Sequence, residues 1–144
     1  MNHIPAIKAV MTAFPHSIDT TSPVSEALAY MEEHSLRHLP VTRHGSLAGM
    51  LTLRDIKLFQ ALAATGRELD SIRVSEIHLD QPYVVDLDTR LDVVLMEMVA
   101  RHISSALVTR HGRLAGVFTT SDACRGFAEF LREHFGPPGG DEAA

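Results

Sequence analysis

The pattern of apolar and polar residues along this chain predicts the same series of five helices and strands twice. In the first half, apolar residues at positions 24, 27, 28 and 31 recur at the spacing of one helical face. Two short apolar runs follow, joined by a polar residue and a glycine, which is typical of two strands in a tight hairpin. The elements predicted for the first half are a strand at 16–19, a helix from the Ser22-Pro23 start, strands at 39–42 and 47–51, and a helix at 53–64.

The second half repeats this pattern at a constant spacing. The stretch TRHGSLAGMLTLRD begins at Thr42 and returns as TRHGRLAGVFTTSD at Thr109, which is 67 residues later, without insertion or deletion. A repeated unit that cannot cover its own apolar face pairs with its copy. The equivalent elements are a strand at 83–86, a helix through 91–98, strands at 106–109 and 114–118, and a helix at 120–134.

Chain order predicts two repeats and a tail. We expect the first repeat, with an N-terminal segment, at 1–66, and a connector with the second repeat at 67–135. Residues 136–144 are rich in Pro and Gly without periodic apolar positions, so we expect them to be disordered.

Composition narrows the possible functions. The 144 residues are 45% apolar, enough for one compact core, and no apolar run is long enough to span a membrane. The net charge of −5 argues against non-specific binding to nucleic acid or to anionic lipid. A single cysteine and the lack of a signal-peptide pattern favour a soluble, cytoplasmic protein.

A threonine and an aspartate three residues later follow the hairpin of each half, at Thr52 and Asp55 and at Thr119 and Asp122. Such a pair predicts a helix start in which each side chain caps a backbone amide of the other residue. A helix start also attracts phosphate, and an aspartate accepts hydrogen bonds from the vicinal hydroxyls of a ribose. A glycine three residues before each threonine would let a ligand lie close to the backbone. The residues alone leave both interpretations open.

The repeated pattern Gly-apolar-x-Thr-x-x-Asp, preceded in the first copy by RHLPVT, resembles the CBS domain family. Two such domains in tandem resemble a Bateman module, and the resemblance runs from about residue 10 to about residue 132. It implies an α/β (α+β) fold of two βαββα CBS repeats, packed about a pseudo-two-fold axis as one compact module. It also implies homodimers and two clefts that bind adenosine-containing ligands such as AMP, ADP, ATP or S-adenosylmethionine.

The resemblance further implies which residues line the clefts. The first cleft is expected to contain Thr52, Asp55, Met50, Arg37, His38, His78, Tyr83 and Ile103. The second is expected to contain Thr119, Asp122, Val117, Met11, His16, Leu36 and Ser104, with Ser105 beside Ser104. An arginine donates a stronger, charge-assisted hydrogen bond to phosphate than a serine does. We therefore expect the first cleft to prefer phosphorylated nucleotides, and the second to bind weakly, to bind an uncharged nucleoside, or to stay empty.

Other chemistry is not indicated. The nine histidines show no paired spacing typical of metal ligands, so we expect no metal site. No Ser-His-Asp arrangement with an oxyanion motif is visible, so we expect neither an enzyme nor a required cofactor. The leading hypothesis is a regulatory module that binds an adenine nucleotide and signals to an unidentified protein target, with no role for nucleic acid or membrane. The alternative is a dimerisation or interaction scaffold with empty clefts.

Overall fold

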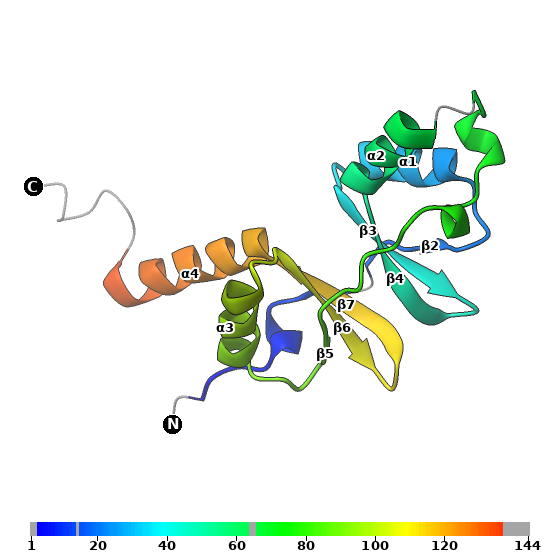
Figure 1. Cartoon of the computed structure of the whole chain (residues 1–144). Coiled ribbons are helices and arrows are strands. Elements are labelled where there is room, and N and C mark those ends of the chain that lie inside the picture. The colour runs from blue at the N-terminus through cyan, green and yellow to red at the C-terminus, as the bar shows by residue number, and fades with distance from the viewer. Residues whose placement is uncertain (1–2, 14, 64–65, 137–144) are drawn as a thin grey trace, which may run out of the picture.

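The computed structural model describes residues 3–13, 15–63 and 66–136, and each half of the chain forms a strand, a helix, two strands and a helix (Figure 1). The predicted order of elements is therefore confirmed. The first repeat consists of β2 (Ile18–Asp19), α1 (Val24–Glu33), β3 (His38–Arg43), β4 (Ser46–Thr52) and α2 (Leu53–Ala63). The second consists of β5 (Val84–Asp86), α3 (Leu91–Arg101), β6 (Ser105–Arg110), β7 (Arg113–Thr119) and α4 (Thr120–Phe135).

Short elements precede each repeat. They are η1 (Ile7–Ala9) and β1 (Thr12–Ala13) before the first repeat, and η2 (Leu69–Ser71) and η3 (Val74–Glu76) between the two. We call residues 5–13 the N-terminal segment and residues 67–80 the connector.

The strands form two sheets of the same design. One has the order β2-β3-β4 and the other the order β1-β7-β6-β5. In each, a short parallel strand joins an antiparallel hairpin, and β4 of one sheet lies against β7 of the other (Figure 1). The starts of α2 and α4 follow directly from these two adjacent strands, so the arrangement brings both Thr-Asp pairs toward the boundary between the repeats.

Both hairpins turn through a histidine and a glycine in the left-handed region. His44 and Gly45 have φ values of 52° and 82°, and His111 and Gly112 have values of 52° and 78°. Two consecutive positive φ angles define the turn type whose twist matches that of a hairpin. The two histidines are therefore turn residues.

The N-terminal segment packs on the second repeat rather than on the first. Ile7 is fully buried in a cluster that includes Val94 and Met98. Its amide donates to the carbonyl of Thr89 at 2.7 Å, and β1 pairs with β7. In Figure 1 this segment, in blue, lies beside α3 and β5.

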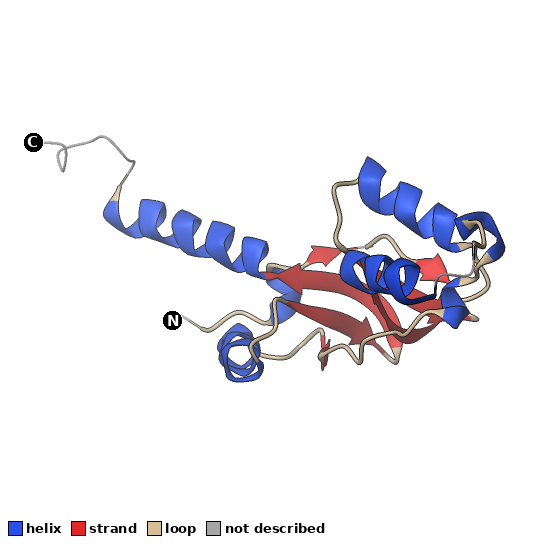
Figure 2. Ribbon diagram, turned by 45° about the horizontal axis from the view of Figure 1, so that its top comes forward, coloured by secondary structure: helices blue, strands red, loops and turns tan. Residues whose placement is uncertain are grey.

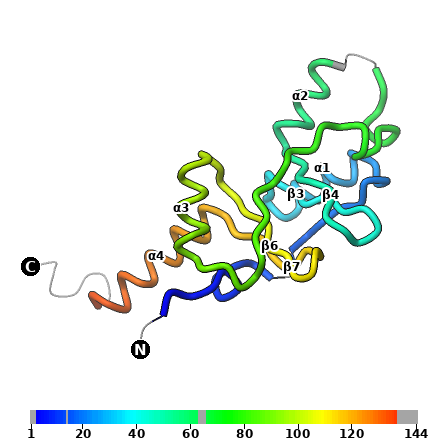
Figure 3. Tube along the Cα trace, turned by 60° about the horizontal axis from the view of Figure 1, so that its bottom comes forward, coloured from blue at the N-terminus to red at the C-terminus, as the bar shows by residue number. Residues whose placement is uncertain are grey.

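The connector makes the equivalent packing on the first repeat. Ile72, Val74 and Ile77 are buried in the cluster that also contains the core residues of α1. The amide of Val24 donates to the carbonyl of Ile72 at 2.8 Å, and Figure 3 shows the connector, in green, running along the first repeat. The connector, which precedes the second repeat, thus covers the first repeat. The N-terminal segment, which precedes the first repeat, covers the second.

This exchange changes the predicted start of the first helix. The N-cap residue is Pro23, not Ser22, and no side chain caps the helix. The first helical amide, that of Val24, instead donates to the connector. The first amide of α3 likewise donates to the carbonyl of Pro5 at 2.9 Å. Tertiary contacts therefore satisfy amides that a local cap would otherwise satisfy.

The predicted division of the chain between residues 66 and 67 stays a prediction about chain order. It does not separate two packing units, because the connector packs on the first repeat and the N-terminal segment packs on the second. The predicted disordered tail at 136–144 lies outside the described residues, apart from Gly136, which is the C-cap residue of α4.

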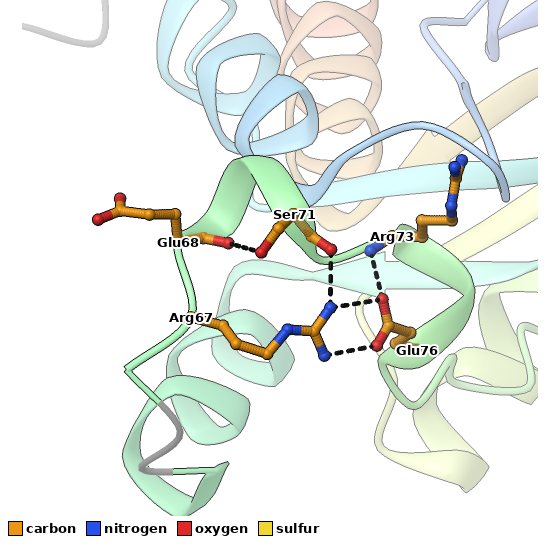
Figure 4. A network of polar contacts seen from close by, with 5 residues as sticks. All are labelled: Arg67, Glu68, Ser71, Arg73 and Glu76. Carbon is orange, nitrogen blue, oxygen red and sulfur yellow. Dashed lines mark hydrogen bonds and ion pairs between the residues drawn. The ribbon is translucent and has the colours of Figure 1, made fainter.

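A polar network holds the connector in shape (Figure 4). Arg67 donates to Glu76 at 2.9 Å and to the carbonyl of Ser71 at 2.7 Å, and the amide of Arg73 donates to Glu76 at 2.8 Å. These hydrogen bonds, that from Arg67 first, hold the pKa of Glu76 below its ordinary value. The network fixes the turn between η2 and η3, which positions the buried connector residues.

The helices of the second repeat leave much apolar surface uncovered. α4 extends away from the strands (Figure 2). None of its side chains, all of which the structure describes, is buried. The exposed apolar side chains of α3 and α4 are Val93, Met96, Val99, Phe127, Phe130, Leu131 and Phe135. No helix in the described part of the chain has the length and apolar character that a membrane span requires.

Candidate functional site

The Thr119-Asp122 pair lies where β7 ends and α4 begins. The Thr119 amide donates to Oδ2 of Asp122 at 2.9 Å, and the Asp122 amide donates to Oγ1 of Thr119 at 3.4 Å. The Thr119 hydroxyl lies 3.2 Å from the same carboxylate oxygen. The predicted reciprocal cap is therefore present in the second repeat.

The first repeat has the corresponding turn with one difference. The Asp55 amide donates to Oγ1 of Thr52 at 3.0 Å, so the hydroxyl caps α2. Oδ2 of Asp55 is buried and has no hydrogen-bond partner in the described part of the chain. Because an unpaired buried carboxylate oxygen is costly, a donor from a bound molecule would be favourable at this point.

A cavity of about 670 Å³ opens beside the Thr119-Asp122 turn. Residues of both repeats line it, together with two residues of the segment between β1 and β2. The lining residues are Thr12, Pro15, His16, Ser35, Leu36, Arg37, His38, Pro40, Met50, Ser104, Ser105, Val117, Thr119, Thr120, Ser121, Asp122 and Arg125. Of the residues predicted for the second cleft, His16, Leu36, Val117, Thr119, Asp122 and Ser104 come together here, and Met11 is not in the lining.

The charged residues are grouped differently from the prediction. Arg37 and His38, expected beside Thr52 and Asp55, line the cavity of Thr119 and Asp122. Met50, also expected in the first cleft, lines this cavity too. The physical reason is that β4 contacts β7 across the boundary between the repeats. Arg37 and His38 lie where β3 begins, beside the end of β4, and therefore reach the helix start of the opposite repeat. The cavity therefore contains both the serine pair and the basic pair.

Asp55 lines a separate groove of about 370 Å³. Its other lining residues are Leu58, Phe59, Leu62, Ile77 and His78. His78 is thus beside Asp55, as predicted, and its ring lies 3.6 Å from the Asp80 carboxylate. Thr52 is not in the lining of either of these two hollows.

Three residues predicted to contact an adenine base pack against the second repeat. Tyr83, Ile103 and Met11 are partly buried against its apolar cluster. Burial raises the pKa of Tyr83, and the guanidinium of Arg101 lies over its ring, 4.6 Å from the centroid. Whether these three also touch a ligand stays a prediction.

The two strand glycines have a role that the sequence did not indicate. A Cβ on Gly49 would lie 2.9 Å from Cβ of Leu79, and a Cβ on Gly116 would collide with Sδ of Met11. Both contacts come from the segment that crosses over from the other repeat. The missing side chains of these glycines therefore leave room for the crossing segment, whereas the sequence predicts that they leave room for a ligand.

Sequence reasoning missed Arg125, which lines the cavity and pairs with Asp122 at 3.0 Å. The signal was available, because two residues three apart on a helix lie on the same face. His16, which also lines the cavity, stacks on His34 with ring centroids 4.0 Å apart. Within the described residues, no three His, Cys, Asp or Glu side chains gather as they would around a metal ion.

The fold and this boundary cavity define a class of protein, a tandem pair of βαββα repeats. Residues 7–61 and residues 74–129 each match the CBS domain family, and the chain belongs to that family. The resemblance noted in the sequence is thereby confirmed.

Hypoxic response protein 1 of Mycobacterium tuberculosis is 30% identical over 121 residues, which are 83% of this chain and 83% of that protein. A crystal structure of Hypoxic Response Protein I with two coordinated zinc ions aligns with a TM-score of 0.70 and 29% identity, covering 83% of this chain and 97% of that one.

Two further solved structures have the same fold. The CBS domain pair of protein MJ0100, in complex with 5′-methylthioadenosine and S-adenosyl-L-methionine, aligns with a TM-score of 0.75 and 25% identity, covering 89% of this chain and 99% of that one. CBSX2 in complex with AMP aligns with a TM-score of 0.73 and 20% identity, covering 89% and 99%.

Proposed function

We propose that this protein is a regulatory module that binds an adenosine-containing nucleotide in the cavity of Thr119 and Asp122. The observation that carries the proposal is that one cavity holds a capped helix start from the second repeat and a basic pair from the first, Arg37 and His38. A helix start and an arginine both favour a phosphate, and an aspartate in the same cavity suits ribose hydroxyls.

The size and lining of the cavity fit a nucleotide. Small-molecule sites generally occupy about 300–1,000 Å³ and combine apolar walls with a few polar groups. Here Leu36, Met50 and Val117 supply apolar surface, while Asp122 and Arg37 supply charge. The MJ0100 domain pair, at 25% identity, binds two adenosine-containing molecules, which supports this ligand class.

The proposed mode of signalling follows from the origin of the lining residues. A ligand that contacts both repeats at once favours the arrangement in which those contacts form, and it shifts the population by its difference in affinity. A partner protein would sense this arrangement. The function requires no chemical step and no cofactor, and we place it in the cytoplasm, where the exposed thiol of Cys124 would stay reduced.

We further propose that a second copy of the chain covers the exposed helix faces of the second repeat. On α4, Phe127, Phe130 and Leu131 recur at helical spacing and are exposed by 63%, 48% and 39%. A monomer rarely leaves such a contiguous apolar stripe in water. A two-fold dimer buries the same patch on both subunits, so a single self-complementary face suffices.

A pair of matched variants tests nucleotide binding. We expect Asp122→Asn to abolish the rise in melting temperature that AMP, ADP or ATP produces in the natural protein. Asp55→Asn is the control, because Asp55 holds the same place in a helix start but does not line this cavity. A ligand at 100 times its dissociation constant stabilises a fold by about 2.7 kcal/mol, which a thermal-shift assay detects.

The alternative function is a scaffold without a ligand. The observation that favours it is the exposed apolar faces of α3 and α4. It predicts no thermal shift with any adenine nucleotide or with S-adenosylmethionine, while the dimer persists. That result would contradict the nucleotide proposal.

A further inference from the structure

Arg125 occupies a place in the cavity that the cap of α4 does not require. It lies one helical turn beyond Asp122, and its Nη1 donates to Oδ1 of Asp122 at 3.0 Å. Oδ2 of the same carboxylate already accepts from the amide of Thr119. Both oxygens of Asp122 are thus engaged by the protein itself.

The two partners differ in how firmly they are held. The Asp122 side chain is 10% exposed, whereas the Arg125 side chain is 65% exposed. An ion pair with one exposed partner contributes little to stability, because water competes for the arginine. Asp122 is fixed by the cap, and Arg125 can exchange its partner at little cost.

The first repeat has no equivalent cation. The position 67 residues before Arg125 is Leu58, which is 52% exposed and lines the apolar groove beside Asp55. Among the described residues that line the Thr119-Asp122 cavity, the fully charged ones are Arg37, Arg125 and Asp122. Two arginines from opposite repeats and one aspartate thus line the cavity, and these three side chains together carry a net positive charge.

We propose that Arg125 makes this cavity select nucleotides with a phosphate chain over unphosphorylated nucleosides. The inference rests on the nucleotide function proposed above and refines its ligand class. Ribose hydroxyls that bond Asp122 compete with Arg125 for Oδ1. The released guanidinium, still on the wall of the cavity, then binds phosphate oxygens opposite Arg37.

Phosphorylated nucleotides and unphosphorylated nucleosides leave the Arg125 guanidinium with different partners. A phosphorylated ligand replaces the Arg125–Asp122 ion pair with a charge-assisted bond to a phosphate. A nucleoside displaces the same arginine and offers it no anion. The displacement thus opposes nucleoside binding and favours phosphorylated ligands.

Calorimetric titration of ADP and of adenosine into the full chain tests this inference. We expect Arg125→Ala to weaken ADP binding by about tenfold or more, since tenfold is the lower end of what one hydrogen bond to a charged group contributes. Adenosine binding should stay unchanged or become tighter. Arg125→Lys, which keeps the charge, should recover part of the ADP affinity. Arg132→Ala removes a cation from the same helix outside the cavity lining and should leave both affinities unchanged.

Three results would overturn the inference. Equal losses for ADP and adenosine in Arg125→Ala would assign Arg125 a purely structural role. An ADP affinity equal to that of the natural protein would show that the arginine does not meet the phosphates. If the natural protein binds neither ligand, the proposed function itself fails and this inference with it. Comparable melting temperatures for Arg125→Ala and Arg132→Ala verify that both variants fold.

Discussion

The two repeats share one order of elements but differ in how completely they cover their apolar side chains. The cluster of the first repeat is the larger, and it draws on α1, both hairpin strands, α2 and the connector. In the second repeat α4 contributes no buried residue, and most of the exposed large apolar side chains lie on α3 and α4. The buried positions also differ, since Ile56 of α2 is buried whereas its counterpart in α4, Ala123, is only partly buried. The exposed apolar side chains of α3 and α4 are the surface that we propose as the dimer contact.

The repeats also differ at the boundary cavity. The basic pair Arg37 and His38 corresponds to Ser104 and Ser105, and Leu58 corresponds to Arg125. All but Leu58 line the cavity of Thr119 and Asp122. Both kinds of divergence thus concentrate cations around the helix start of the second repeat, although each repeat has its own Thr-Asp pair.

The largest expected effect tests the exchange of segments between repeats. Ile7→Ala removes a fully buried side chain from the smaller core, so we expect the free energy of unfolding to fall by about 2–5 kcal/mol. Urea denaturation measures this loss. Ile4→Ala is the control, because Ile4 is 48% exposed, and it should change stability by no more than about 0.5 kcal/mol. Equal effects of the two variants would contradict the packing of the N-terminal segment on the second repeat.

The next effect concerns the interface assigned to the second repeat. Phe130→Glu places a carboxylate in the proposed dimer contact, so the dimer dissociation constant should rise by more than about tenfold, or about 1.4 kcal/mol. Light scattering after size exclusion measures the mass over a range of concentrations. Leu62→Glu makes the same change on α2, where Leu62 is 75% exposed, and should leave the dimer intact. Dissociation in both variants would show that the first repeat contributes to the interface as well.

The smallest effect concerns the polar network of the connector, in which Arg67 pairs with Glu76. The pKa of Glu76 is lowered in the folded protein, chiefly by Arg67, so its ionised form stabilises the fold above the ordinary pKa of glutamate, about 4.3. This contribution is lost as the pH falls through the lowered value. Glu76→Gln should therefore lower stability slightly at pH 7, and the difference from the natural protein should vanish in acid. Denaturation curves at both pH values measure it, and a difference that does not depend on pH would exclude the titration of Glu76.

The local sequence pattern was sufficient to predict the helices and strands and the protein family. The helical stripe through Met31 and Met98, the hairpin glycines and the Thr-Asp helix starts all depend on neighbours a few residues away, and each lies where it was predicted. Most of the predicted residues of the second cleft also line one cavity, and these were predicted from the resemblance to the CBS domain family rather than from the local pattern.

What the sequence by itself determined is therefore the repeated unit, since its elements follow from contacts that are close along the chain. Only the tertiary structure decided which copy each preceding segment would cover, because Ile7 and the α3 residues of its cluster, Val94 and Met98, are more than 80 positions apart in the chain. The same holds for Arg37, which lies 82 to 85 positions away from Thr119 and Asp122 yet shares a cavity with them. Side chains at the boundary between two like halves meet through the packing of the sheets, and no local pattern encodes that meeting.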